Sequence, residues 1–182
     1  NSQDQVFFLY LLFTFISLKV WFDMVADDLT AGGMMEGVAN SSYFLLFLND
    51  ETLTRTYVLM EVRRAIELNK PIILVVESDA AFGALLDAGG NPDLNAYFEQ
   101  AKQHTDVYAL LAEVHAGRIK VVPFKRSPAE VEGMMRSLVS AMELPWPSSG
   151  RALPGASQGS KKLQVVGNPA NSIDQCLGLM AE

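Results

Sequence analysis

The chain has 182 residues, a hydrophobic fraction of 49% and a formal net charge of -7. This length suits one domain with an apolar core, and the composition excludes a disordered or fibrous protein. The 21 acidic side chains against 14 Lys and Arg argue against a nucleic-acid groove and against binding to an anionic membrane surface. A single cysteine, Cys176, excludes an internal disulfide and a zinc cage, so we expect a reducing compartment, the cytoplasm.

A nearly unbroken apolar run extends from Val6 to Ile16. It is shorter than the roughly 20 residues that cross a bilayer, and no basic segment precedes it as in a secretory signal. We interpret Val6–Tyr10 as a buried strand that leads into a short core helix. The alternative interpretation is a truncated membrane anchor upstream of a soluble domain.

Short β-rich runs alternate with helical patterns along the next part of the chain. The further predicted strands are mostly continuous apolar runs, as in sheets buried on both faces: Lys19–Asp23, Tyr43–Leu48, Pro71–Glu77 and Ile119–Phe124. Helical spacing of apolar residues, capping residues and proline positions predict helices at Gly32–Asn40, Arg55–Asn69, Asp93–Thr105 and Pro128–Met142. The alternation predicts an α/β fold, a flavodoxin-like three-layer sandwich with a central five-stranded parallel sheet.

The composition changes after residue 144. Pro, Gly and Ser dominate the stretch from Pro145 to Ser160, which is typical of flexible linkers. We therefore assign residues 1–144 to the domain and residues 145–182 to a flexible tail, in which Ile173–Met180 could form one short helix.

Polar residues follow three of the predicted strands. Asp23 ends the second strand, Asn49 and Asp50 follow the third, and Glu77-Ser78-Asp79 follow the fourth. In open α/β sheets, ligands bind outside the carboxyl ends of the strands. We therefore place the default ligand site at this edge of the sheet.

Five short features occur in a fixed order over the first half of the chain. They are Asp23 at a strand end, the Leu-x-x-Gly loop Leu29–Gly32, the pair Ser41-Ser42 before a strand, the helix opening Arg55–Glu61, and the basic-Pro-apolar strand that begins at Lys70. In this order and spacing, the stretch resembles the Toll/interleukin-receptor (TIR) domain family. Three features differ from that family. Its Trp-Cys pair is Tyr57-Val58 here, and only Leu11–Leu18 lies where a full helix normally joins the first two strands. Leu11-Leu12 follow Tyr10 where the family usually has a polar or basic residue just after the first strand.

The resemblance implies a signalling domain that cleaves NAD+ at the nicotinamide–ribose bond. It implies Glu61 as the catalytic carboxylate, and Tyr57, Asp23, Asn49 and Asp50 as residues that bind the nucleotide. NAD+ would be the substrate, with no prosthetic group and no metal. The expected protein partners are other TIR domains, in a homo-oligomer, and we expect neither nucleic acid nor a membrane as a partner of this domain.

The proposed chemistry needs little from the protein. Nicotinamide leaves NAD+ as a neutral molecule, so no general acid is required, and one carboxylate can stabilise the oxocarbenium-like centre. Each residue also has a simpler interpretation. Glu61 would be a surface carboxylate paired with Arg64, Tyr57 would pack in the core, and Asp23 would cap a loop.

Other functions remain open at this point. The chain could be a TIR–TIR interaction module without catalysis. It could also resemble a nucleoside deoxyribosyltransferase, which uses a helix glutamate near a Lys-Pro strand, as Glu61 and Lys70-Pro71 could provide. A receiver domain would need paired acids after the first strand, and the run Phe7–Tyr10 supplies none.

Overall fold

Five parallel strands form one sheet in the order β1-β5-β2-β3-β4. The computed structural model describes residues 2–22, 30–146 and 162–166. The strands are β1 (Lys19–Phe22), β2 (Tyr43–Leu48), β3 (Ile72–Val76), β4 (Lys120–Pro123) and β5 (Lys162–Val166). The predicted α/β class with a five-stranded parallel sheet is confirmed.

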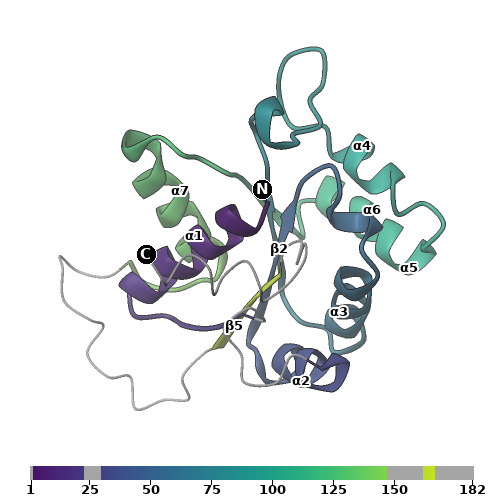
Figure 1. Cartoon of the computed structure of the whole chain (residues 1–182), viewed down its shortest axis with the longest axis horizontal. Helices are drawn as coiled ribbons and strands as arrows, with labels where there is room; N and C mark the ends of the chain where they lie inside the picture. Colours follow the sequence, from purple (N-terminus) through teal and green to yellow (C-terminus); the bar gives the residue numbers. More distant parts are fainter. Residues whose placement is uncertain (1, 23–29, 147–161, 167–182) are drawn as a thin grey trace, which may run out of the picture.

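Helices cover both faces of the sheet, as the flavodoxin-like three-layer prediction requires (Figure 1). On one face lie α1 (Ser2–Phe15) and α7 (Pro128–Ala141). On the other lie α2 (Ala31–Asn40), α3 (Thr56–Glu67), α4 (Leu94–Glu99), α5 (Thr105–Tyr108) and α6 (Leu110–His115). Two short 3₁₀ turns, η2 (Thr52–Thr54) and η3 (Ala80–Phe82), follow β2 and β3.

The alternation of side chains along β2 builds two separate cores. Leu45 and Phe47 pack with α1 and α7, whereas Phe44, Leu46 and Leu48 pack with α3 and its neighbours. A strand buried on both faces must be apolar at every position, which explains the continuous apolar run. β2 lies at the centre of the sheet, with β3 beside it.

The N-terminal apolar run forms a helix, so the predicted strand Val6–Tyr10 is wrong. Val6, Leu9 and Phe13 recur at helical spacing and are buried against the sheet. A continuous apolar run fits a buried helix as well as a buried strand, and its length of more than ten residues favours the helix. In the described part of the chain, no helix is both long and apolar enough to span a membrane.

The C-terminal segment supplies an interior strand of the sheet, β5. β5 pairs in parallel with β1 on one side and with β2 on the other, and Leu163, Val165 and Val166 are buried. The prediction that the whole tail lies outside the domain is therefore wrong for Lys162–Val166. The predicted helix Ile173–Met180 and Cys176 lie outside the described residues. In the flavodoxin-like strand order 2-1-3-4-5, β5 occupies the position of the first strand.

The predicted helix Asp93–Thr105 is longer than the observed α4, and α5 and α6 were not predicted. Asp93 caps α4 by accepting a hydrogen bond from the backbone N–H of Ala96 at 3.2 Å, as a helix start requires. The chain then turns and continues as α5 and α6. Their buried apolar residues recur at helical spacing: Val107, Leu110, Leu111 and Val114.

Candidate functional site

Helix α3 turns a carboxylate toward the sheet. Val58, Val62 and Ala65 form the buried stripe of this helix, and Glu61 lies on the same side with only 3% of its surface exposed. Oε1 of Glu61 accepts a hydrogen bond from Nε2 of Gln164 on β5 at 3.1 Å. A charged side chain is rarely buried without a polar partner, and here the interior strand β5 supplies one.

Helix α2 approaches the sheet closely beside this pair. A Cβ atom on Gly37 would lie 2.6 Å from Cε2 of Trp21 and 2.9 Å from Oε1 of Gln164. Only a residue without a side chain allows this approach. Oε1 of Gln164 has no hydrogen-bond partner among the described residues. Glu61 and Gln164 are thus closed off from solvent in this conformation.

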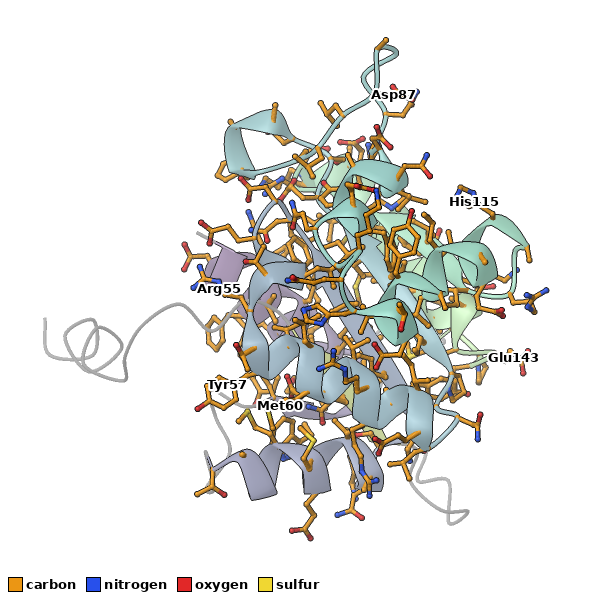
Figure 2. All side chains as sticks on the ribbon, turned by 90° about the vertical axis from the view of Figure 1, so that its right-hand side faces the viewer. Arg55, Tyr57, Met60, Asp87, His115 and Glu143 are labelled. Carbon is orange, nitrogen blue, oxygen red and sulfur yellow. The ribbon has the colours of Figure 1, made fainter. Side chains whose placement is uncertain are left out.

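The simpler interpretations of Glu61 and Tyr57, as a surface carboxylate and a core residue, do not hold. Arg64 donates a hydrogen bond to Glu67 at 3.0 Å on the outer face of α3, whereas Glu61 faces inward, so Glu61 is not a solvated surface carboxylate. Tyr57, one turn before Glu61, has 53% of its surface exposed, so it does not pack in the core. Figure 2 shows Tyr57 projecting outward from the first turn of α3, with Arg55 just before the helix and Met60 on the next turn.

Asn49 and Asp50 stabilise turns at the end of β2. The side-chain Oδ1 of Asn49 accepts hydrogen bonds from the hydroxyl of Thr52 at 2.6 Å and from the backbone N–H of Glu51 at 3.2 Å. The backbone N–H of Asp50 donates to the carbonyl of Gly83, and the Asp50 carboxylate packs against that glycine. Asn49 thus fixes η2, and Asp50 holds the loop after η3. Asp23 lies outside the described residues.

A buried ion pair closes the end of β3. The Glu77 carboxylate is fully buried and accepts two hydrogen bonds from Arg126, at 2.8 and 2.6 Å. Its Oε1 also accepts from the backbone N–H groups of Ser78 and Asp79. Such bidentate, charge-assisted contacts fix the position of both side chains. Arg126 thereby holds the segment after β4 against the end of β3.

Tyr97 joins the same edge of the sheet to α4. Its hydroxyl donates to the backbone carbonyl of Glu77 at 3.1 Å and accepts from the backbone N–H of Leu85 at 2.9 Å. Burial raises the pKa of Tyr97 to about 12, and the negative charges of Glu77 and Asp50 act in the same direction.

The structure therefore separates the predicted site residues. Tyr57 and Glu61 lie on successive turns of α3, whereas Asn49 and Asp50 serve the η2 and η3 turns. Among the described residues, no group of three or more His, Cys, Asp or Glu side chains could hold a metal ion.

Sequence reasoning missed Gln164 and Arg126. The run Lys162–Val166 has the alternating apolar residues of a strand, a signal that the Pro- and Gly-rich segment before it obscured. Arg126 carries no sequence signal, because only the fold brings it to Glu77 across 49 positions. Comparison with protein-family models, with curated proteins and with solved structures gives no significant match for this chain.

Proposed function

We propose that this chain is a TIR-like signalling domain of the cytoplasm that cleaves NAD+ at the nicotinamide–ribose bond, with Glu61 as its catalytic residue. The observation that carries the proposal is the inward-facing, buried Glu61 on the second turn of α3. Burial of a carboxylate has a large desolvation cost, so the position of Glu61 indicates a functional role that an experiment can test. Its place in the sequence matches the glutamate of the family that the chain resembles.

The reaction suits a single buried anion. When the bond between C1′ of the ribose and the pyridinium nitrogen breaks, both bonding electrons go to the nitrogen, and nicotinamide leaves as a neutral molecule. Positive charge then develops on the ribose, and Glu61 would stabilise it in surroundings where water screens the attraction weakly. A water molecule attacks C1′ and completes hydrolysis to ADP-ribose and a proton.

Gln164 and Tyr57 support this role in different ways. The Gln164 amide donates to Oε1 of Glu61, which restricts the orientation of the carboxylate. The ring of Tyr57 is exposed one turn earlier, where it can stack on a base of the dinucleotide as it approaches. Because Glu61 is only 3% exposed, the ribose reaches it only after a neighbouring element moves. Binding of the substrate therefore includes a conformational step.

Replacement of Glu61 by Gln tests the proposal, because it keeps the shape of the side chain and removes its charge. We expect Glu61→Gln to lower the rate of nicotinamide release from NAD+ by about 10²–10³-fold. The matched control is Glu67→Gln on the outer face of the same helix, which should release nicotinamide at the wild-type rate. Equal rates for wild type and Glu61→Gln at high protein concentration would refute the assignment.

A second candidate function is assembly without catalysis, and α1 favours it. Phe7, Leu11 and Phe15 are exposed at a spacing of four residues along this helix, and Phe15 is 87% exposed. Two copies of the chain could bury the same stripe against each other in a symmetric dimer. Sedimentation of wild type and Phe15→Ser over a range of concentrations tests this. The stripe predicts association that Phe15→Ser weakens, and a wild type that stays monomeric at high concentration excludes it.

A further inference from the structure

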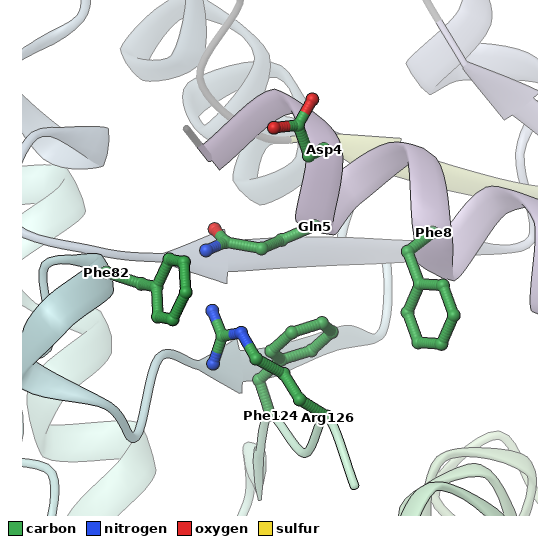
Figure 3. Close-up of a pocket in the computed structure, with 6 residues that line it drawn as sticks. All are labelled: Asp4, Gln5, Phe8, Phe82, Phe124 and Arg126. Atoms are coloured by element: carbon green, nitrogen blue, oxygen red, sulfur yellow. The ribbon is translucent and has the colours of Figure 1, made fainter. Parts of the chain in front are cut away.

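A cleft of about 300 Å³ lies between the first turns of α1 and the ends of β3 and β4. Among the described residues, six line it: Asp4, Gln5, Phe8, Phe82, Phe124 and Arg126. Figure 3 shows Gln5 reaching from α1 toward Phe82 and the Arg126 guanidinium, with Phe8 and Phe124 beside them. Phe8 and Phe124 pack in the core of the α1 and α7 face, whereas Glu61 is on α3, which covers the other face of the sheet. This cleft is therefore distinct from the proposed catalytic site.

The guanidinium of Arg126 is held in one position at the wall of this cleft. Its two terminal nitrogens donate to Glu77, and its Cζ lies 3.9 Å from the centroid of Phe82 and 4.9 Å from that of Phe124. An arginine has five N–H donors, so this pairing leaves three N–H groups at the edge of the guanidinium. A ligand in the cleft can thus meet aromatic walls and a fixed hydrogen-bond donor.

Gln5 supplies an unused acceptor. This side chain is only 5% exposed, and its Oε1 has no hydrogen-bond partner among the described residues. A buried acceptor without a partner lowers stability, so a ligand N–H that meets Oε1 when the Gln5 amide turns toward the cleft removes an existing penalty. The cleft therefore favours a donor at Gln5.

The charges of the cleft disfavour anions. Glu77 neutralises Arg126, and Asp4 adds an exposed carboxylate at the rim. A phosphate or carboxylate ligand would meet this negative charge, and Arg126, the one cation among the described lining residues, is already paired with Glu77. A neutral ligand with flat apolar faces avoids the repulsion and uses the aromatic walls.

We propose that this cleft binds a small, uncharged, planar nitrogen heterocycle that carries an N–H donor beside an acceptor, as nucleobases and nicotinamide do. The donor contacts Gln5, the acceptor faces the edge of Arg126, and the ring packs against Phe8 and Phe124. The assignment is independent of NAD+ cleavage, since it involves neither Glu61 nor any reaction.

Isothermal titration of the full chain with adenine, nicotinamide and nicotinate tests the proposal, with no NAD+ present. We expect adenine or nicotinamide to bind with a Kd of about 1 mM or tighter, which is a modest affinity for so few atoms. Nicotinate has the same ring but a negative charge and no amide donor, so it should bind at least about tenfold more weakly than nicotinamide. Binding of adenine alone assigns the cleft to a nucleobase, and binding of nicotinamide alone assigns it to a pyridine carboxamide.

Single-residue variants test whether the heterocycle binds in this cleft. Gln5→Leu should weaken it at least about tenfold without lowering Tm, because it removes an acceptor that has no partner. Phe82→Ala is a second variant at a partly exposed ring and should weaken binding as well. The exposed amide Gln103 provides the control, and Gln103→Leu should bind as wild type does. The proposal is overturned if neither adenine nor nicotinamide binds, if nicotinamide binds and nicotinate binds as tightly, or if Gln5→Leu and Phe82→Ala both bind with unchanged affinity.

Discussion

Gln164 donates a hydrogen bond from Nε2 to Oε1 of Glu61 over 3.1 Å, across 103 positions of the chain. This contact joins a strand from the end of the chain to the helix that bears the proposed catalytic carboxylate. The strand β5 thus completes the sheet and also provides a polar partner of Glu61.

The first prediction concerns this pair. Gln164→Leu leaves the buried carboxylate without its amide donor, so it should lower the free energy of unfolding by about 1–3 kcal/mol. Adding Glu61→Leu removes the carboxylate as well, and the double variant should recover much of that loss. Urea denaturation of the two single variants and the double variant measures the coupling. Strictly additive effects would show that the hydrogen bond contributes nothing to stability.

The second prediction concerns the extent of the domain. β5 lies between β1 and β2, so a protein that ends at Trp146 loses the pairing of β1 with the sheet. It also loses the burial of Leu163, Val165 and Val166, worth about 1.5–3 kcal/mol for each side chain. This sum is comparable with the total stability of a small domain, about 5–15 kcal/mol. We therefore expect the protein of residues 1–146 to lose cooperative unfolding.

Thermal melts followed by circular dichroism check this expectation. The matched comparison is the protein of residues 1–166, which retains β5 and should melt cooperatively close to the full chain. Identical melting curves for residues 1–146 and for the full chain would show that β5 does not hold the sheet together.

The third prediction concerns the close approach of α2 to the sheet. Gly37→Ala places a Cβ atom 2.6 Å from the Trp21 ring, so one of the two must shift. Overpacking of this kind typically costs about 1–3 kcal/mol, which exceeds the gain of up to about 1 kcal/mol from replacing a helical glycine. Gly133→Ala in α7 is the control, because no atom lies within 4 Å of its added Cβ. Denaturant titration should show Gly37→Ala destabilised and Gly133→Ala slightly stabilised. A stabilised Gly37→Ala would contradict the close packing.

The strands β1 to β4 could be predicted from the sequence, and β5 could not. Tyr43–Leu48 and Ile72–Val76 are short continuous apolar runs, as a strand buried on both faces of a sheet requires, and their length favours a strand over a helix. The run at Val6–Ile16 is equally apolar, and its continuous character hides the helical stripe of Val6, Leu9 and Phe13. Composition alone made residues 162–166 part of a tail, since five residues carry too little signal beside a Pro- and Gly-rich linker.

The candidate site could also be predicted only in part from the sequence. The place of Glu61 on α3 follows from helical spacing, because it flanks the stripe of Val58 and Val62. Its partner Gln164 could not be predicted, because pairing across so many residues depends on the register of β5. The structural roles of Asn49 and Asp50 likewise depend on turns whose geometry the sequence does not specify.

The last prediction concerns the pH dependence of stability through Tyr97. Its pKa is about 12 in the folded protein, raised from the ordinary value of 10.0 mainly by burial. Above pH 10 the unfolded chain releases this proton while the folded protein still retains it. The free energy of unfolding contributed by Tyr97 is therefore fully present below about pH 10, and it decreases as the pH rises toward 12.

Tyr97→Phe should remove this dependence. At pH 7 the variant should be less stable than wild type by about 1–3 kcal/mol, because the backbone groups of Leu85 and Glu77 lose their hydroxyl partner. Between pH 9 and about 11.5 its stability should fall less steeply than that of wild type, so the two curves converge. The exposed Tyr57 provides the control, and Tyr57→Phe should follow the wild-type curve. Urea denaturation at several pH values measures the difference, and parallel curves for wild type and Tyr97→Phe would show that burial of this hydroxyl does not control alkaline unfolding.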